Sequence, residues 1–481
     1  CYDARNDIDY FSELTDLLLW KNAIEMSAAG DIFHRSLKPR PIPLLELKNP
    51  VQTRIIKQGV FEREKELDTF ALTVSQDRVV WGECQNLCQL DYSAESGIKI
   101  ESGNNAAVIV DLGRESVGFI TLKLIAGAGT VVDISHGEHL DDGQVRSKIG
   151  ARNFTDRYIT KDGLNIYQIP FRRIGGRYLQ LNITNINSDL ELIYTGIAPW
   201  SLPLPDESSF DCSDVQMLKL RRVAIDTMKL CMHEHYEDCP WREQALYSYD
   251  SRNQIIYGYY IWGNYNFAKA SLELLGHGIR DDGYLNLCAP MKRDLTIPIF
   301  SFVWVSEVLE YYLYSGDIEL FERFDSQIEF MIEKRLKNFC LDNSLYHPGT
   351  EEYLWSFYEW VEGLSEHGCD ANEFNALYNM YFYEMLQAYR QLLIYNGEAG
   401  RARKYRQLGK DLKDAIVKNF WNTDRGCFAT RNIDGKQEMY HEHTQFLALS
   451  LDIADDEQKE MIADNLYSAN LVESSFSPML Y

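Results

Sequence analysis

The chain has 481 residues, of which 45% are hydrophobic and 25% charged, so it is long enough for several globular domains and is not a disordered chain. Its 48 basic and 72 acidic residues give a net charge of −24, which should repel phosphate backbones and anionic membrane surfaces and argues against nucleic acid as a partner. No apolar run approaches the roughly 20 residues of a membrane-spanning helix. The ten cysteines form neither Cys-x-x-Cys pairs nor a zinc spacing with His, so no metal and no other cofactor is expected.

Residues 1–50 are expected to form a partial N-terminal segment. The stretch from Phe11 to Ile24 reads as the middle of an element, so we expect the chain to begin partway through a domain. The proline-rich run from Lys38 to Pro43 predicts an extended linker. The first residues lack the basic start and apolar stretch of a signal peptide, whereas Cys1 is compatible with a processed lipoprotein terminus. The compartment stays undecided, with an extracytoplasmic location favoured over the cytoplasm.

Residues 51–205 are rich in short β-type runs separated by turn residues. Gly127-Ala128-Gly129 and Asp141-Asp142-Gly143 are predicted turns. Strands this short and this closely spaced are typical of antiparallel β-sandwiches rather than of a parallel sheet. Strands are predicted at 106–110, 119–124, 156–159, 167–169 and 178–181.

Helical periodicity begins near residue 207 and continues through the region 206–481. Glycines lie between or at the ends of the helical patterns, as helix terminators do. Antiparallel pairs of such helices fit a helical toroid. Helices are predicted at 214–236, 241–275, 301–315, 318–336, 372–396, 399–420, 441–452 and 456–469.

The stretch from Glu237 to Asp250 carries the densest set of chemically useful side chains. Pro240 suits the first position of a helix, and in a helix that starts there Glu243, Tyr247 and Asp250 would lie on one stripe, with Asp238 just ahead. Neighbouring carboxylates favour keeping one of them protonated, and a neutral acid can protonate a leaving group. The alternative is a capped helix with a solvated acidic face, and the spacing alone does not choose between the two.

This stretch resembles the signature of the bacterial α-L-rhamnosidases, which are inverting glycoside hydrolases built on an (α/α)6 barrel. The resemblance implies that Glu243 is the general acid. It also implies that three flanking residues bind the sugar hydroxyls. One departure concerns stacking: this chain reads Leu246-Tyr247-Ser248-Tyr249 where the family commonly has Gly-Trp, so Tyr247 would replace a sugar-stacking Trp. The sugar is therefore less securely implied than the chemistry. The matching residues are Asp238, Cys239, Pro240, Arg242, Glu243 and Asp250, and the three sugar-binding ones are Asp238, Arg242 and Asp250.

Aromatic residues further along resemble the family's sugar pocket. Trp304 matches a position that lines the pocket, although a Trp at apolar helical spacing is as readily core. Trp355 and Trp360, in the densest aromatic cluster of the chain, match a segment that lines the cleft, and Trp360 is slightly preferred. Glu359 and Glu362 are weaker candidates for a partner carboxylate than for a solvated loop.

Two other segments resemble family elements. The turn 281–290 resembles a loop at the barrel mouth, although an ordinary turn is the more frequent interpretation. The segment 441–445 resembles the start of a barrel helix, for which capping is as good an interpretation as substrate contact. Matches in the β region, such as Gly176-Arg177-Tyr178, resemble the sandwich that precedes the barrel, and that region either binds carbohydrate or, as we favour, braces the barrel.

Inverting hydrolysis also needs a second carboxylate that activates water. The resemblance places this base in a Gly-Ala-Thr…Trp-Glu motif, which the sequence up to Tyr481 does not contain, so we expect the base to lie beyond Tyr481 and the chain alone to be inactive. An (α/α)6 barrel also needs twelve helices, about two pairs more than are predicted.

The sequence thus predicts a multidomain β + α chain, with antiparallel β-sandwich modules followed by an (α/α)6 barrel that is incomplete at its C-terminal end. The predicted function is an α-L-rhamnosidase acting on a carbohydrate substrate. The alternatives are an (α/α)6 glycosidase for another or an acidic sugar, and a carbohydrate-binding pseudo-enzyme. The oligomeric state, a homodimer included, stays open.

Overall fold

The computed structural model describes residues 1–6, 39–82, 88–291, 293–367, 370–466 and 471–472, and it forms two compact units. The first unit comprises Cys1–Pro203, Ser213–Glu234 and Cys239–Gln244, and the second comprises Leu204–Cys212, His235–Asp238 and Ala245–Tyr481. The predicted boundary near residue 205 lies close to Pro203. Two later segments, Ser213–Glu234 and Cys239–Gln244, nevertheless belong to the first unit. The helix-like stretch from Phe11 to Ile24 lies outside the described residues.

The first unit is built on a 12-stranded sheet whose strands pair antiparallel, apart from the parallel pair β1 and β13. Two helices, α1 (Phe70–Gln76) and α2 (Val215–Leu230), belong to the same unit. The paired strands are β1 (Tyr2–Asp3), β2 (Glu46–Leu47), β3 (Thr53–Glu62), β4 (Arg78–Gly82), β5 (Gln89–Leu90), β6 (Ile98–Ile100), β7 (Asn105–Ala126), β8 (Val131–Gly137), β13 (Thr155–Ile159), β14 (Gly163–Gln168), β15 (Ile174–Thr184) and β16 (Leu190–Ser201). Two separate hairpins are β9 (Leu140–Asp141) with β10 (Gln144–Val145), and β11 (Lys148–Ile149) with β12 (Arg152–Asn153).

The long strand β7 belongs to both layers of this sandwich. Its first half lies between β3 and β15, and its second half lies between β14 and β16. Inward-facing residues of both halves, such as Val108 and Leu122, are in the same buried cluster. The strands predicted at 106–110 and 119–124 are therefore one continuous strand, because a chain that passes from one layer to the other can keep its pairing on both sides. The other predicted strands and the two predicted turns are confirmed.

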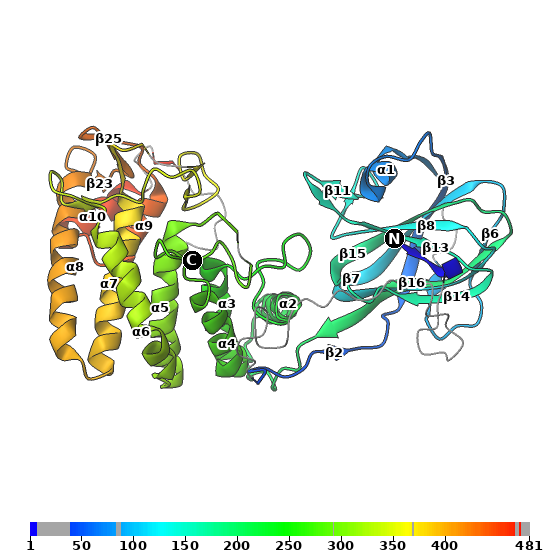
Figure 1. The fold of residues 1–481 in the computed structure, drawn as a ribbon, viewed down its shortest axis with the longest axis horizontal. Coiled ribbons are helices and arrows are strands. Elements are labelled where there is room, and N and C mark those ends of the chain that lie inside the picture. The colour runs from blue at the N-terminus through cyan, green and yellow to red at the C-terminus, as the bar shows by residue number, and fades with distance from the viewer. Residues whose placement is uncertain (7–38, 83–87, 292, 368–369, 467–470, 473–481) are drawn as a thin grey trace, which may run out of the picture. The chain divides into compact units, whose positions relative to one another are not determined.

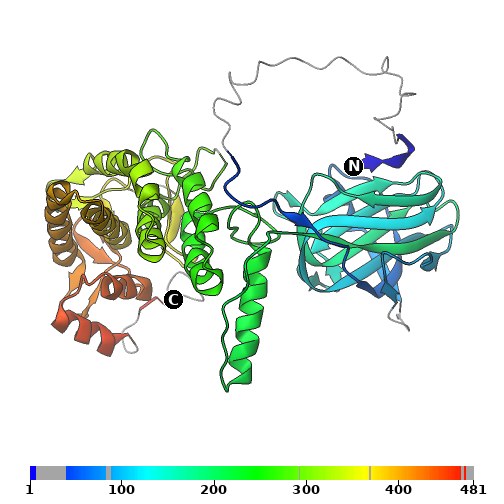
Figure 2. The ribbon, with the colours of Figure 1, turned by 90° about the horizontal axis from the view of Figure 1, so that it is seen from below.

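The second unit consists of helical hairpins (Figure 1). Helices α3, α5, α7 and α9 form an inner row of neighbours, and each is followed by a second helix. The pairs α3/α4, α5/α6 and α7/α8 pack together. Figure 2 looks along the axes of several of these helices. The helices are α3 (Ser248–Trp262), α4 (Tyr265–Gly276), α5 (Pro298–Ser315), α6 (Glu319–Leu336), α7 (Ala376–Tyr395), α8 (Ala399–Phe420), α9 (Glu442–Ser450) and α10 (Asp456–Asn465).

The connections between helices differ strongly in length at the two ends of this unit. Inner helices pass to their outer partners through the short links 263–264, 316–318, 396–398 and 451–455, whereas outer helices return through the long segments 277–297, 337–375 and 421–441. Because the helices alternate in direction, the long segments gather at the end where the inner helices begin. They carry the short strands β17 (Phe339–Cys340), β18 (Leu345–Tyr346), β19 (Trp355–Phe357), β20 (Ser365–His367), β21 (Glu373–Asn375), β22 (Trp421–Asn422), β23 (Cys427–Phe428), β24 (Arg431–Ile433) and β25 (Lys436–Glu438).

The prediction of one helix over 241–275 is wrong. Residues 239–244 form turns, Gln244 has a φ of 53°, and α3 begins only at Ser248 with Tyr247 as its N-cap. Gly263 then ends α3 in the left-handed conformation, which costs glycine little. Glu243 and Asp250 are therefore not on one helical stripe.

Candidate functional site

The loop Cys239–Gln244 belongs to the first unit and packs on the sandwich. The buried ring of Trp241 lies 4.7 Å from the ring of Phe154, centroid to centroid. A Cβ on Gly175 would stand 2.1 Å from the carbonyl oxygen of Pro240, so only a glycine lets strand β15 approach the backbone of the loop this closely. The sandwich therefore fixes the position of the two residues that follow Trp241.

Those two residues are the predicted Arg242 and Glu243. Glu243 Oε1 accepts a hydrogen bond from Arg152 Nη2 at 2.9 Å, and its side chain is 28% exposed. Arg242 is exposed as well. Within its own unit Glu243 is thus held by a guanidinium, whereas the carboxylates predicted as its neighbours, Asp238 and Asp250, belong to the second unit.

Asp238 and Asp250 lie at defined positions of the second unit. Asp238 Oδ1 accepts the N–H of Ala245 at 2.9 Å, and the N–H of Asp238 donates to the Ala245 carbonyl oxygen at 2.9 Å. These two bonds join the residues that flank the loop. Asp250 is in the first turn of α3, where a carboxylate interacts favourably with the helix dipole.

Three predicted sugar-stacking residues belong to one aromatic cluster at the loop end of the second unit. Tyr247 packs edge-on against Phe300 at 6.4 Å, and Phe300 packs against Phe357 at 6.3 Å. Phe357 then contacts Trp360 at 4.9 Å, and Trp355 contacts Trp360 at 5.6 Å. Trp360 is 71% exposed, so its ring offers a face for stacking.

The predicted contact of Trp304 with sugar is incompatible with its environment. Its side chain is 0% exposed, its indole N–H donates to the carbonyl oxygen of Leu272 at 3.0 Å, and its ring packs edge-on against Phe324. It lies on α5, whose side chains are buried on nearly all sides. The apolar helical spacing around Trp304 therefore reflects core packing, because a helix that is hydrophobic on all sides is usually buried.

For both Glu359 and Glu362, the sequence favoured a solvated loop over a partner carboxylate. In the structure the two side chains differ in burial. Glu362 is exposed, whereas Glu359 is buried. Glu359 Oε1 accepts the N–H of Trp360 at 2.7 Å, and Oε2 has no hydrogen-bond partner among the described residues. Burial raises the pKa of Glu359. Its place next to Trp360 could not be read from the spacing of the sequence.

The sequence did not indicate the polar network between the inner helices. Arg252 of α3 bonds Glu310 of α5 at 2.7 Å and Glu384 of α7 at 2.9 Å. Glu307, which is fully buried, accepts hydrogen bonds from Ser248 and Ser251 at 3.0 and 3.2 Å. Burial raises its pKa well above the ordinary value. In the sequence, these polar residues were marked only by their positions among the apolar residues of the helices.

The segment at the start of α9 has mainly structural contacts. His441 bonds Thr430 Oγ1 at 2.8 Å and the Glu362 carbonyl oxygen at 2.9 Å, and Gln445 bonds both backbone groups of Phe428. His443 Nε2 lies 3.3 Å from the hydroxyl of Tyr381, and burial lowers the pKa of His443 to about 4. These side chains hold the neighbouring backbone in place.

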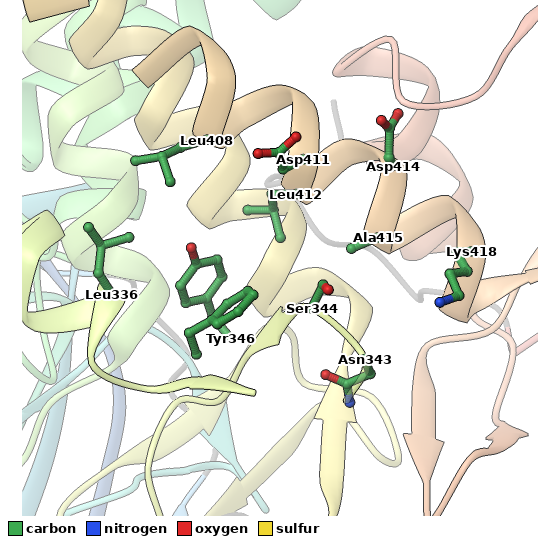
Figure 3. Close-up of a pocket in the computed structure, with 11 residues that line it drawn as sticks. Leu336, Asn343, Ser344, Tyr346, Leu408, Asp411, Leu412, Asp414, Ala415 and Lys418 are labelled. Carbon is green, nitrogen blue, oxygen red and sulfur yellow. The ribbon is translucent and has the colours of Figure 1, made fainter. Parts of the chain in front are cut away.

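The second unit has two further hollows away from the aromatic cluster. A pocket of about 630 Å³ lies between α6, α8 and the β17–β18 hairpin, and Figure 3 shows Tyr346, Asp411 and Asp414 around it. A second one, of about 820 Å³, is lined partly by Arg280, Asp281 and Asp282 of the predicted mouth loop. Neither contains Asp238, Tyr247, Asp250, Trp355 or Trp360.

Neither a metal centre nor a membrane-spanning helix is found among the described residues. Among them, no group of three or more His, Cys, Asp or Glu side chains is arranged to hold a metal ion. None of the helices that the structure describes combines the length and apolar character that crossing a membrane requires.

Two family models match this chain. The bacterial alpha-L-rhamnosidase 6 hairpin glycosidase domain matches residues 205–476, more than half of the chain. The bacterial alpha-L-rhamnosidase concanavalin-like domain matches residues 101–194, within the sandwich. Both matches agree with the predicted order of a β-rich region followed by a helical glycosidase barrel.

Comparisons with individual proteins agree with these matches. The alpha-L-rhamnosidase of Formosa agariphila is 22% identical over 350 residues, which are 69% of this chain and 36% of that protein. Among solved structures, the GH78 rhamnosidase of Bacillus sp. GL1 is similar with a TM-score of 0.70 and 23% identity, over 78% of this chain and 39% of the other. A rhamnosidase from Klebsiella oxytoca with rhamnose bound gives 0.69 and 17%, over 90% and 81%. The chain spans little more than a third of the length of the Formosa and Bacillus proteins, and identities this low establish the fold alone.

Proposed function

Because this chain belongs to the bacterial alpha-L-rhamnosidase 6 hairpin glycosidase family, we propose that it acts in the hydrolysis of α-L-rhamnosides, releasing terminal L-rhamnose with inversion. The observation that carries the proposal is the family match over residues 205–476, which includes the whole run from Asp238 to Asp250. The rhamnose bound to the Klebsiella protein is consistent with this substrate class.

In the proposed mechanism, Glu243 protonates the glycosidic oxygen as the bond to the leaving group breaks. Its 28% exposed side chain leaves the carboxyl accessible, and the packing of Trp241 on the sandwich limits the freedom of the loop that carries it. A positioned acid of this kind contributes rate because the proton is delivered in the transition state. Arg152, which donates to Glu243 Oε1, orients the carboxyl.

The remaining proposed roles concern binding. Asp238, Arg242 and Asp250 bind the sugar hydroxyls, for which carboxylates and a guanidinium supply the acceptors and donors. The exposed face of Trp360, with Tyr247 and Trp355 in the same cluster, stacks on the apolar face of the sugar. The proposal assigns no general base.

The test is Glu243→Gln in the full-length protein, assayed on two α-L-rhamnosides that differ in their leaving group. With an alcohol as the leaving group, kcat should fall on the order of 10²–10⁴-fold, because such a group leaves only when it is protonated. With 4-nitrophenol, which leaves readily as an anion, the loss should be much smaller. Circular dichroism should show an unchanged fold.

The matched control is Glu64→Gln, at a side chain that is 82% exposed in the first unit, and it should retain full activity. A panel of other nitrophenyl glycosides checks the sugar. Equal losses with both leaving groups would remove Glu243 from the role of acid. Faster hydrolysis of a different glycoside would replace rhamnose as the substrate.

A further inference from the structure

Helix α8 is strongly basic, although the chain as a whole has a net charge of −24. It contains seven basic and two acidic side chains, and it lies at the outer edge of the second unit in Figure 1. Four of the basic residues follow one another at intervals of three or four positions, which places them on one side of the helix. This basic stripe consists of Arg403, Arg406, Lys410 and Lys413.

The basic stripe is poorly neutralised by its own chain. Arg403 and Arg406 are exposed, and neither has an ion pair or a hydrogen bond with a described residue. Lys410 lies 3.5 Å from Asp414, but the two side chains are 69% and 65% exposed, so this pair contributes little energy. The cations of the stripe are therefore available to an acidic partner.

The second unit carries an acidic counterpart on α10. This helix contains four acidic side chains and one basic one, and all four acidic side chains are exposed. Lys413 Nζ donates to the carbonyl oxygen of Asp452, in the link 451–455 that leads into α10, so the two helices carry their charges on neighbouring parts of the same unit. The acidic stripe consists of Asp456, Glu457, Glu460 and Asp464.

The two stripes match each other in length as well as in charge. At 1.5 Å per residue, positions 403–413 extend over about 15 Å of helix and positions 456–464 over about 12 Å. If α8 of one copy lay along α10 of another, opposite charges would face each other over most of this length. A surface that carries both stripes is self-complementary, because a twofold axis produces the same contact twice.

We propose that two copies of this chain associate through α8 and α10, with the basic stripe of each copy lying against the acidic stripe of the other. The acidic stripe favours this partner over an anionic polymer, which α10 would repel, whereas a second copy neutralises both stripes. Exposed ion pairs are individually weak, so the dimer is reversible and sensitive to salt. The inference does not depend on the proposed hydrolysis, because neither stripe contains a residue with an assigned part in it.

Sedimentation velocity of the whole chain tests the association. At about 0.1 M salt the screening length is about 10 Å, which damps the repulsion between distant charges of two acidic copies but leaves pairs in contact attractive. The sedimentation coefficient should therefore rise from the monomer value towards the dimer value as the protein concentration increases. At about 1 M salt the screening length falls to about 3 Å, and the chain should sediment as a monomer.

Charge reversal tests the two stripes separately. Arg403→Glu combined with Arg406→Glu should raise the dissociation constant of the dimer at least about 10-fold, because acidic side chains then face acidic ones. Glu457→Lys combined with Glu460→Lys should do the same with basic side chains. An equimolar mixture of these two variants should recover the dimer, since each of its two contacts again joins a positive stripe to a negative one.

The matched control is Lys65→Glu combined with Arg78→Glu. It changes the net charge by as much as the α8 variant does, at exposed side chains of the first unit. It should leave the dissociation constant unchanged. Circular dichroism should show the same helix content in all variants.

Three results overturn the inference: a chain that stays monomeric at about 0.1 M salt, a dimer that survives both charge reversals, or a mixture of the two variants that remains monomeric. Titration with dextran sulfate tests the other kind of partner. A monomeric chain that binds this polyanion, and no longer binds it after Arg403→Glu and Arg406→Glu, uses the basic stripe for an anionic polymer instead of a second copy.

Discussion

The interiors of the two units are stabilised in different ways. The sandwich encloses a cluster of aliphatic and aromatic side chains from both layers, including Val108, Ile120 and Leu122, all of them buried. The inner helices of the second unit instead enclose charged and hydroxyl-bearing groups. Arg252 there links Glu310 and Glu384, and Tyr381 links Tyr249 with His443.

The interior of the second unit thus contains polar side chains that connect its inner helices. Apolar burial stabilises the core of the sandwich, although the first unit also contains a buried ion-pair network in which Arg63 bonds Asp77 and Asp133. The proposed acid Glu243 lies on a loop at the surface. A buried polar network contributes little net stability compared with apolar packing, yet it fixes geometry when every member is satisfied. The hydrogen bonds of Ser248 and Ser251 to Glu307 tie the first turn of α3, which carries Asp250, to α5.

Removing apolar volume from the sandwich should have the largest effect on stability. Leu122 is fully buried between the two layers, so Leu122→Ala should cost about 3–5 kcal/mol of unfolding free energy. Urea unfolding measured by circular dichroism checks this loss. The loss should be the same at acidic and neutral pH, since no titrating group is involved, and a strong pH dependence would contradict an apolar origin.

Breaking the charged network should cost about 3 kcal/mol and should depend on pH. Arg252→Met leaves Glu310 and Glu384 without their cation in a largely buried position. Burial raises the pKa of Glu310, so it is protonated early as the pH falls. A neutral acid needs no counterion, and the deficit should therefore shrink from pH 7 towards about pH 5.

The control for this variant is Arg222→Met, at an exposed helix pair with Asp226, which should cost under about 0.5 kcal/mol. If both variants cost the same, the network does not stabilise the helical unit.

The half-buried Glu115 of the sandwich unit offers a stabilising change. Burial, reinforced by Glu138 and opposed by Arg177, raises the pKa of Glu115 to about 8. Between its ordinary value and about 8, the unfolded chain releases this proton and the folded chain keeps it, so wild-type stability should fall as the pH rises through this window. Glu115→Gln should raise stability by about 1–2 kcal/mol at about pH 8 and have no effect at about pH 4. Thermal melts at both values test this, and a gain at acidic pH would contradict it.

The smallest effect on stability is expected at the exposed aromatic ring of the second unit. Trp360→Ala should leave the melting temperature nearly unchanged, because the side chain is 71% exposed, but it should raise KM for a rhamnoside by a few-fold to about 10-fold. Steady-state kinetics on a nitrophenyl rhamnoside measure this. Trp360→Phe, which keeps a ring, should recover part of the affinity. An unchanged KM would remove Trp360 from the binding surface.

Local pattern was enough to predict much of the fold. Alternation and turn residues located four of the twelve strands of the sheet, β7, β13, β14 and β15, and the 3.6-residue period located α5, α6, α7 and α8 to within a few residues. Pattern failed where a long-range contact overrode it. The loop Cys239–Gln244 reads as the start of a helix, but it forms turns because Trp241 packs into the sandwich against Phe154.

For the site, the motif from Asp238 to Asp250 singled out the residues but not their surroundings. Glu243 bonds Arg152, which lies 91 positions away in the sequence, a partner that the motif did not indicate. Trp304 and Trp360 looked equally suitable, and only their burial, 0% against 71% exposed, separates a core residue from a ligand platform.

The sequence by itself determined the β-then-α order and the family signature, because periodicity and short motifs are properties of neighbouring residues. Only the tertiary structure decided which charges meet and which rings remain exposed. The physical reason is that burial and Coulomb interactions depend on distance in space, and the chain brings residues far apart in the sequence to within a few ångströms.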